Sequence, residues 1–315
     1  MRKEEFGIRS KDQRHILHGI IWIPEGEVKA VLQVVHGMVE FIDRYDGFAR
    51  YLCGLGIAVI GHDHLGHGLT AGRDEDLGYF AREGGEQLII EDMYQVTEEM
   101  RRRFPSAPHF IMGHSMGSFC LRKYLTFYAG QVDGAIIMGT GDFPLLAARC
   151  GKLAAGILMR WKGRHYRSKR LAAMVFNGYL KGIDHPRTPE DWLTKDEAVV
   201  DAYRKNKFNT FIFTVSAYHD FFEIIEYDTR MTGLDRIPKK LPLFIVSGDR
   251  DPVGSWGSGP RRLYEKYRKK GFQDVRLKLY ENDRHEILNE TDRRTVYEDL
   301  GEWLLEKSRR VVEDS

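Results

Sequence analysis

Gly113-His114-Ser115-Met116-Gly117 follows an apolar run at residues 108–112 and precedes a run of helical character that begins at Ser118. A G-x-S-x-G string between a strand and a helix is typical of a nucleophile elbow, a sharp turn that exposes a serine hydroxyl. Both glycines are needed because a Cβ at either position would collide with the neighbouring strand or helix. In a chain with 32 glycines the string alone is weak evidence, so its setting and its partners must support it.

Strands and helices alternate along the first part of the chain. The nearly continuous β-branched run at residues 30–35 predicts a strand that is buried on both faces of a sheet. Further strands are expected at residues 6–9, 16–23, 57–60, 108–112 and 134–138, and helices at residues 44–55, 86–104 and 118–129. This alternation is typical of an α/β protein in which helices cover both faces of a parallel sheet.

The alternation stops between residues 142 and 235, where the apolar spacing is helical. Helices are expected over the basic stretch 159–170, from a capping box at residues 194–197 through Tyr203, and over Phe211, Val215, Tyr218, Phe222 and Ile225. Strands then return at residues 241–246 and 275–280, with helices at 261–270 and at the C-terminus. We therefore expect a core formed by residues 1–141 and 236–315, and an inserted helical cap, or lid, formed by residues 142–235.

The overall composition excludes several classes of protein. The formal net charge of +2 suggests neither nucleic acid nor an anionic membrane as a partner. The N-terminus has no apolar segment of signal-peptide length, and no apolar run approaches about 18 residues. Cys53, Cys120 and Cys150 lie among apolar neighbours, which favours buried thiols over a disulfide. We expect a soluble, cytoplasmic protein that is a monomer or a homodimer.

A serine hydroxyl becomes a nucleophile only when a base removes its proton, and that base needs a carboxylate to orient it. In this architecture the partners follow in the order serine, acid, histidine, each just past the end of a strand. His285 follows the last predicted strand and is the candidate general base. Asp251 is preferred as its acid over Asp249, which we interpret as a turn residue, and over Asp283, which lies beside His285 on the same loop.

The tetrahedral intermediate of acyl transfer carries an oxyanion that needs two backbone donors. One donor is expected to be the N–H of Met116, which follows the serine at a helix N-terminus. The other is expected from the loop that follows the buried strand at residues 30–35. There Gly37 lets the main chain approach closely, and Met38 supplies the candidate N–H.

Taken together, these residues resemble the monoacylglycerol lipase and lysophospholipase group of serine α/β-hydrolases, which is similar to the S33 serine aminopeptidases. The resemblance covers about residues 28–305 and rests on residues 36–40 with Arg44 and Tyr45, 62–68, 113–117, 248–253 and 280–285. The elbow alone marks only the superfamily, whereas its pairing with residues 62–68 is more specific. The resemblance implies an α/β-hydrolase fold with an eight-stranded, mostly parallel sheet, a helical cap between strands six and seven, no cofactor and a carboxylic-ester substrate. It also supports Ser115, Asp251 and His285 as a catalytic triad, with Met38 and Met116 as the oxyanion hole.

Residues 62–68 could also be interpreted as a metal site, because His62, Asp63, His64 and His67 are of the types that zinc sites use. We favour a structural role, since the histidines alternate with glycines near the nucleophile and the group that the chain resembles has no metal there. Asp63 is then expected to brace the oxyanion loop. No metal and no cofactor are predicted.

The cap is expected to determine which substrate is accepted. Its aromatic side chains could line an acyl groove, although most of them are expected simply to pack: Trp161, Phe176, Trp192, Phe208, Phe211, Phe213, Phe221 and Phe222. The candidate substrate-binding residues are Gly37, His114, Trp161, Phe211 and Phe222, with His114 interpreted chiefly as a packed neighbour of the nucleophile. The basic run at residues 160–167 could meet anionic headgroups, but a solvated face is favoured, so membrane contact is at most peripheral.

The sequence therefore predicts a serine hydrolase that cleaves a medium- or long-chain acyl ester, such as a monoacylglycerol or a lysophospholipid, through an acyl-enzyme. The alternatives are a short-chain or aromatic carboxylesterase, and then an aminopeptidase or an acyltransferase that uses the same triad. An epoxide hydrolase or dehalogenase is disfavoured, because it would need an aspartate in place of Ser115. A non-catalytic ligand-binding protein is also disfavoured, because no member of the triad is missing.

Overall fold

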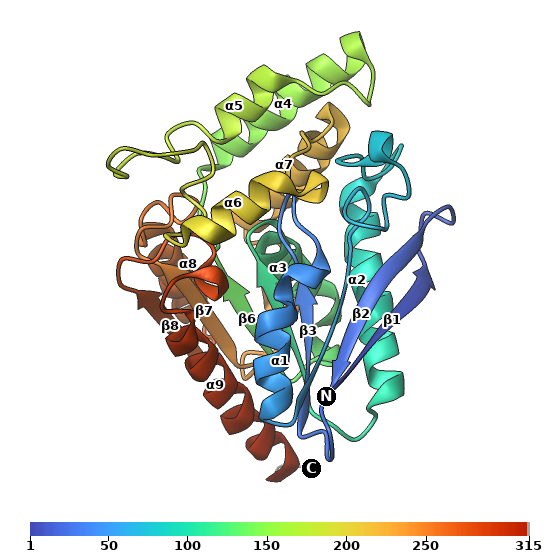
Figure 1. Cartoon of the computed structure of the whole chain (residues 1–315), viewed down its shortest axis with the longest axis vertical. Helices are drawn as coiled ribbons and strands as arrows, with labels where there is room; N and C mark the ends of the chain where they lie inside the picture. Colours follow the sequence, from blue (N-terminus) through green and yellow to red (C-terminus); the bar gives the residue numbers. More distant parts are fainter. Residues whose placement is uncertain (314–315) are drawn as a thin grey trace.

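The computed structural model describes residues 1–313, which form one eight-stranded sheet in the order β1-β2-β4-β3-β5-β6-β7-β8 (Figure 1). The strands are β1 (Arg2–Arg9), β2 (Ile16–Ile23), β3 (Ala30–Val35), β4 (Ile57–His62), β5 (His109–His114), β6 (Gly134–Met138), β7 (Leu243–Gly248) and β8 (Val275–Tyr280). Only β2 pairs antiparallel to its neighbours β1 and β4, and every other described pair is parallel. The prediction of a mostly parallel eight-stranded sheet is confirmed.

Helices cover both faces of this sheet. They are α1 (Asp46–Gly54), α2 (Gly85–Arg103), α3 (Met116–Tyr128), α8 (Ser258–Lys269) and α9 (Arg293–Glu313). On β5, Phe110 and Met112 lie in the apolar cluster that α1 and α9 complete, whereas Ile111 lies in the cluster that α2, α3 and α8 complete. Alternate residues of a strand point to opposite faces, so these side chains assign the helices to the two sides.

The central strands of the sheet are fully buried. Every residue of β3, β4, β5 and β7 is buried, as the continuous apolar runs in the sequence predict for strands covered on both faces. Because β3, β5, β6, β7 and β8 run parallel, their carboxyl ends lie along one edge. Loops that leave this edge carry the predicted site residues.

Between β6 and β7 the chain forms α4 (Leu145–Lys162), α5 (Lys169–Val175), α6 (Glu197–Lys205) and α7 (Val215–Thr229). Helix α4 packs along α7, and α7 in turn packs on α3. In Figure 1 these helices lie together beyond the carboxyl edge of the sheet, with α4 and α5 outermost. Short 3-10 turns complete the description: η1 (Ile42–Tyr45), η2 (Asp74–Asp76), η3 (Ala129–Gln131), η4 (Lys207–Asn209), η5 (Leu234–Arg236) and η6 (Ile287–Asn289).

Three details of the helices between β6 and β7 differ from the predictions. The basic stretch is not one helix, because α4 stops before Gly163, whose φ of 86° interrupts it. Helix α6 is capped by Asp196, which accepts from the N–H groups of Ala198 and Val199, and not by Thr194. Phe211 precedes α7 and lies outside it, although its spacing from the later apolar residues is helical.

The helices and the cysteines test two further expectations from the sequence. In the described part of the chain, no helix is long and apolar enough to cross a membrane. Cys53 and Cys120 are buried, as expected, but the prediction for Cys150 is wrong, because its side chain is exposed on α4.

Candidate active site

Ser115 stands in the turn between β5 and α3, with φ 52° and ψ −121°. A non-glycine residue with positive φ is strained, and such strain is typical of functional positions. Ser115 N–H donates to the carbonyl of Met138 on β6 at 3.0 Å, which fixes the turn to the neighbouring strand. The structure therefore presents the elbow geometry that the sequence predicts.

The two glycines of the elbow are required by close packing. A Cβ on Gly113 would collide with the carbonyl of Gly117, and a Cβ on Gly117 would collide with the carbonyls of Val35 and His36 at the end of β3. Backbone atoms cannot move aside as a flexible side chain can. Glycine is therefore the residue that lets α3 start this close to the sheet.

His285 lies on the loop after β8, with Nδ1 3.0 Å from Oδ2 of Asp251. Both residues are buried, with 2 % of His285 and none of Asp251 exposed. The Asp251 carboxylate is held by the N–H of Val253 at 2.8 Å and by the hydroxyl of Ser247 at 3.2 Å. The angle between the two groups leaves Nδ1 without a hydrogen bond in this structure, but a buried carboxylate at this distance is placed to orient the imidazole and to leave Nε2 for proton transfer.

The two rival carboxylates have other partners. Asp249 is partly exposed and accepts from the N–H of Asn282 at 2.8 Å, which ties the loop after β7 to the loop after β8. Asp283 is fully buried and pairs with Lys195 Nζ at 2.7 Å. Burial raises the pKa of Asp283 to about 6, in spite of this pairing. Asp251 is thus the aspartate that faces His285.

The loop after β3 lies directly against the serine. A Cβ on Gly37 would lie 2.9 Å from Cβ of Ser115, so the backbone at this position approaches the elbow closely. The N–H of Gly37 already donates to Oε1 of Glu40. Within residues 1–313, the amides of Met38 and Met116 donate no hydrogen bond. These two amides are therefore free to donate to an oxyanion, which is the role that the sequence analysis expects of them.

A buried charge network that the sequence analysis missed connects this loop to the histidine loop. Glu40 accepts from Tyr45 at 3.0 Å and from His114 Nδ1 at 3.0 Å, and Arg44 donates to its other oxygen at 3.0 Å. Arg44 also forms two hydrogen bonds with Glu286, each of 2.7 Å. Glu40 lies within the motif at residues 36–40 and Glu286 directly follows the motif at 280–285, but nothing in one sequence shows that Arg44 connects them.

Burial and charge oppose one another in this network. Burial alone would raise the pKa of Glu40, but the hydrogen bond from His114 and the charges of His114 and Arg44 outweigh burial and lower it. Burial alone would lower the pKa of His114, but Glu40 and Glu286 raise it above its ordinary value. His114 Nε2 also lies 3.4 Å from the carbonyl of His285. Both ring nitrogens of His114 therefore face protein groups, which supports its interpretation as a packed neighbour.

The histidines of the loop after β4 form a buried cluster with His36. The ring of His36 lies 4.3 Å from His64 and 5.0 Å from His67, and His62 lies 4.8 Å from His64. His36 Nε2 accepts from the N–H of His64 at 3.0 Å, so its proton is on Nδ1, which donates to the carbonyl of Gly37. Burial lowers the pKa of His62 and of His67 to about 3.

Asp63 has the bracing role that was expected of it. Its carboxylate accepts from the N–H of Ile42 at 2.8 Å, from the N–H of Leu69 at 2.9 Å, and lies 2.9 Å from Nδ1 of His18. These contacts join the loop after β3 to the loop after β4. The ligand atoms that come close enough for a metal ion, among residues 1–313, belong to Asp283, Glu290 and Asp292, and Lys195 Nζ lies within 3.8 Å of all three. An ammonium group there already supplies the positive charge.

The predicted substrate-binding residues of the cap are scattered. Trp161 does not reach the site, because its side chain is 80 % exposed at the end of α4. The cause is the helical period, which places it on the outer face of α4. Phe222 fills the contact between α7 and α4, where a Cβ on Gly151 would lie 2.6 Å from its ring. Phe211 is half-buried, with its ring 5.5 Å from that of His67.

Another aromatic residue lies against His285. The ring of Trp192 is 5.0 Å from that of His285, and Tyr179 and Phe176 lie behind it at 4.8 Å and 6.0 Å. Trp192 and Phe176 are among the aromatic residues that the sequence analysis names as possible groove residues, and Tyr179 is not. No periodic pattern marks this group, because it lies in irregular chain before α6.

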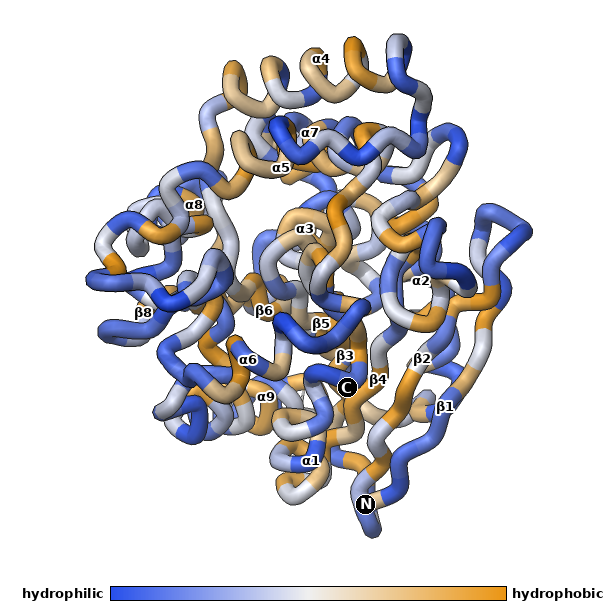
Figure 2. Tube along the Cα trace, turned by 45° about the horizontal axis from the view of Figure 1, so that its top comes forward, coloured by the Kyte–Doolittle hydropathy of each residue, from blue (hydrophilic) through white to orange (hydrophobic). Residues whose placement is uncertain are grey.

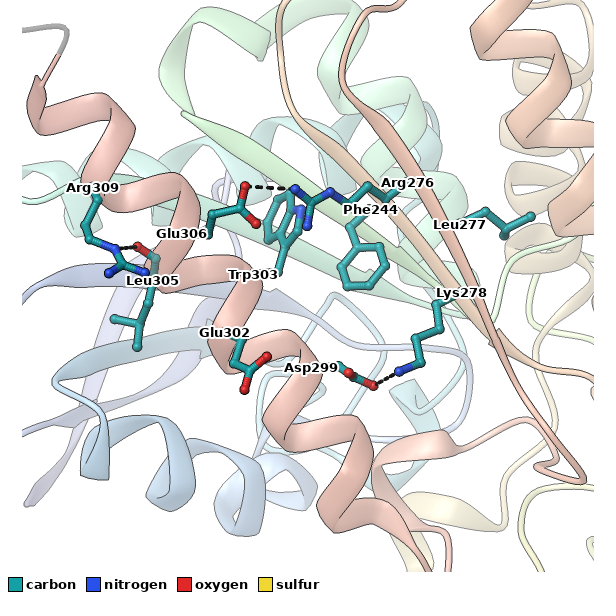
Figure 3. Close-up of a pocket in the computed structure, with 10 residues that line it drawn as sticks. All are labelled: Phe244, Arg276, Leu277, Lys278, Asp299, Glu302, Trp303, Leu305, Glu306 and Arg309. Carbon is teal, nitrogen blue, oxygen red and sulfur yellow. Dashed lines mark hydrogen bonds and ion pairs between the residues drawn. The ribbon is translucent and has the colours of Figure 1, made fainter.

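A separate groove lies between β8 and α9 (Figure 3). It has a volume of about 830 Å³ and includes Phe244 and Trp303 in its lining. Ion pairs cross from strand to helix on its walls, Arg276 with Glu306 at 2.8 Å and Lys278 with Asp299 at 2.5 Å. No predicted site residue lines it, so this groove is distinct from the candidate active site.

Comparison with known proteins places this geometry in a family. The model of the serine aminopeptidase S33 family matches residues 26–292. The monoacylglycerol lipase of Mycolicibacterium smegmatis is 25 % identical over 308 residues, covering 90 % of this chain and 91 % of that protein. Human monoglyceride lipase is 25 % identical over 291 residues, covering 91 % and 86 %. A thermostable carboxyl esterase from Bacillus coagulans, solved with glycerol, superposes with a TM-score of 0.89 at 26 % identity and covers 97 % and 99 %. The chain belongs to the serine aminopeptidase S33 family of α/β-hydrolases and is an ester hydrolase of that family.

Proposed function

We propose that this hydrolase cleaves monoacylglycerols or similar single-chain acyl esters, with Ser115 as nucleophile, His285 as general base and Asp251 as the acid that orients it. The observation that carries the proposal is the 3.0 Å approach of Asp251 Oδ2 to His285 Nδ1, with Ser115 in a strained turn against Gly37. The choice of a monoacylglycerol is supported by the names of the relatives that match along most of the chain.

In the first step, Ser115 Oγ attacks the carbonyl carbon of the ester while His285 Nε2 takes its proton. Asp251 stabilises the imidazolium that forms, because its carboxylate faces the protonated Nδ1. The electron pair of the carbonyl moves to oxygen, and the N–H groups of Met38 and Met116 donate to this oxyanion. Both amides belong to segments that the buried contacts of Glu40, Asp63 and the elbow already fix.

In the second step, the intermediate collapses and the bond to the alcohol breaks. The imidazolium gives its proton to the departing alcohol oxygen, which leaves an acyl group on Ser115. His285 then removes a proton from water, and the hydroxide attacks the acyl carbon. The free acid departs, Ser115 regains its proton, and no cofactor is needed to balance either step.

We assign residues 142–235 to a cap that covers the serine, and residues 1–141 and 236–315 to the catalytic core. The assignment is supported by the path of the chain, which leaves the sheet after β6, forms α4 to α7 and returns at β7. The packing of α7 on α3, the helix that begins beside Ser115, supports it further. A roof of this kind would exclude water from the acyl group and determine the chain length accepted.

The cap also has an apolar outer face. Leu146, Leu153, Ile157 and Trp161 recur at helical spacing along α4, with exposed fractions of 72, 65, 48 and 80 %. Figure 2 shows this helix with its apolar segments at the outer edge of the molecule. We propose that this face makes peripheral contact with the lipid aggregate that contains the substrate.

Sedimentation with phosphatidylcholine vesicles tests this contact. The double variant Ile157→Ser/Trp161→Ser is expected to sediment with vesicles less than wild type does, while its hydrolysis of dissolved 4-nitrophenyl acetate stays unchanged. Ile16→Ser is the matched control, because Ile16 is 52 % exposed on β2 and does not belong to α4. Equal sedimentation of wild type and double variant contradicts the contact.

A series of 4-nitrophenyl esters from acetyl to dodecanoyl tests the proposed substrate class. We expect kcat/KM to rise from acetyl to octanoyl or longer, and Ser115→Ala to abolish turnover of every ester. A maximum at acetyl would favour the short-chain carboxylesterase instead, which the likeness to the Bacillus coagulans carboxyl esterase keeps as the second candidate. No turnover of any ester by wild type would contradict an ester hydrolase altogether.

A further inference from the structure

The cap touches the catalytic histidine through one short segment. Residues 191–195, which precede α6, run beside the loop after β8 that carries His285. The N–H of Glu286 donates to the carbonyl of Leu193 at 2.7 Å, and the N–H of His285 lies 3.4 Å from the carbonyl of Trp192. The backbone of the histidine is therefore bonded to the cap and not only to the core.

Side chains reinforce this junction on both sides of the histidine. Arg284 donates to the carbonyls of Asp191 at 2.5 Å and Thr194 at 3.1 Å. Lys195 Nζ donates to Asp283 Oδ1 at 2.7 Å, and Lys195 N–H donates to Glu290 at 3.1 Å. The flanking residues of His285 thus hold the cap segment, and the cap segment holds them.

The His285 ring itself is enclosed by residues of both the core and the cap. Asp251 approaches Nδ1, the ring of His114 lies at 4.8 Å, and the ring of Trp192 lies at 5.0 Å. Asp251 and His114 belong to the core, whereas Trp192 belongs to the cap. Removing the Trp192 ring or shifting its backbone would leave the base free on one side.

The Lys195 ammonium group is the electrostatic centre of the junction. Asp283 and Glu290 are fully buried, and Lys195 lies within 3.8 Å of both. Without the ammonium group, two buried carboxylates would face one another with no counter-charge between them. Such a pair is unfavourable. Either the loop that carries His285 would have to shift, or one of the two carboxylates would have to take up a proton.

We propose that residues 191–195 are a positioning strap for His285, fastened by the Lys195–Asp283 ion pair. The strap keeps the imidazole aligned for the step in which it gives its proton to the departing alcohol. This proposal rests on the proposed function, because it takes His285 as the general base and acid. It adds that the cap helps to hold the catalytic machinery and is not only a cover.

Two esters with the same acyl group test the strap. Loss of glycerol from monooctanoylglycerol needs a proton from His285, whereas nitrophenolate leaves 4-nitrophenyl octanoate without one. In Lys195→Met, kcat/KM is expected to fall at least about tenfold more for monooctanoylglycerol than for the nitrophenyl ester. Lys195→Arg, which keeps the charge, is expected to restore most of the loss. Trp192→Ala is expected to reproduce the selective loss, and Trp192→Phe, which keeps a ring against His285, to reproduce it less.

The matched control is Arg293→Met, which removes an ion pair of 3.2 Å between α9 and Asp196 at the same junction without touching His285. It is expected to leave the ratio of the two kcat/KM values unchanged. Equal losses on both esters in Lys195→Met, or no loss on either, would overturn the strap while leaving the proposed function intact. Wild type that hydrolyses neither ester would overturn the proposed function, and the strap with it.

Discussion

The N–H of Gly37 donates to the carboxylate of Glu40, three residues further along the same loop. This bond occupies the Gly37 amide, whereas the next amide, that of Met38, has no partner in the described structure. Glu40 in turn is tied through Arg44 to Glu286, the residue after His285. The loop after β3 and the loop that carries His285 are therefore held by one buried network.

Replacement of Glu40 tests that network. Glu40→Ala is expected to lower kcat/KM for 4-nitrophenyl octanoate about 10- to 100-fold, because the loop that carries Met38 loses its anchor. Glu40→Gln keeps an oxygen that can accept from Gly37 and is expected to lose less. Glu5→Gln on the exposed part of β1 is the control. Full activity in Glu40→Ala would show that the loop does not need this carboxylate.

A pair of glycine variants tests the closeness of the loop to the nucleophile. Gly37→Ala would place a Cβ 2.9 Å from Cβ of Ser115, so we expect the loop and the elbow to separate and activity to fall at least about 100-fold. Gly54→Ala is the matched control, because a Cβ there would meet no atom within 4 Å. Kinetics on 4-nitrophenyl octanoate and circular dichroism would be compared for both. An active Gly37→Ala would exclude the close approach.

Two aspartates of one loop allow the acid to be identified. Asp251→Asn is expected to lower kcat by about 10³- to 10⁴-fold, because an amide no longer stabilises the imidazolium and favours the wrong tautomer. Asp249→Asn is expected to keep kcat within about threefold, since Asp249 accepts only from the backbone of Asn282. The reverse order of the two losses would mean that the acid is Asp249.

The buried histidines predict a loss of stability in mild acid. The folded pKa of His62 is about 3, well below the ordinary value of 6.5 in the unfolded chain. Below pH 6.5 the unfolded state therefore binds a proton that the folded state does not, and the free energy of unfolding falls as the pH falls. The stabilising contribution is complete above pH 6.5 and is lost between pH 6.5 and about 3.

A His62→Gln variant separates the contribution of His62 to the free energy of unfolding from that of other groups. One of these is His114, whose raised pKa acts in the opposite direction. Between pH 7 and pH 5 the free energy of unfolding, measured by urea denaturation, is expected to fall by about 2 kcal/mol less in the variant than in wild type. Identical pH dependence in the two proteins would mean that His62 is protonated in the folded state.

The sequence was most informative where one short segment determines one local structure. Buried strands are continuous apolar runs, and the residues just beyond β5, β7 and β8 are where a parallel sheet presents functional groups. Ser115, Asp251 and His285 were therefore candidates before any coordinates were known. The elbow glycines were also interpretable, because their need is steric and local.

The sequence was less informative where distant segments meet. Arg44 and Glu286 are 242 residues apart, and neither has a pattern that would pair it with the other. Trp161 is a candidate substrate-binding residue because it belongs to the cap, but α4 has an apolar outer face as well as an inner one. Thr194 fits the capping box and is predicted to cap a helix, whereas its hydroxyl donates to the carbonyl of Asn289 on the histidine loop.

Covalent labelling tests the central assignment most directly. The enzyme would be inhibited with an alkyl fluorophosphonate, digested, and the modified peptide identified by mass spectrometry, with Ser115→Ala as the control. We expect one phosphonyl group on Ser115 with complete loss of octanoyl-ester hydrolysis, and no label on Ser115→Ala. Labelling of another serine, such as the neighbouring Ser118, or full activity in Ser115→Ala, would contradict Ser115 as the nucleophile.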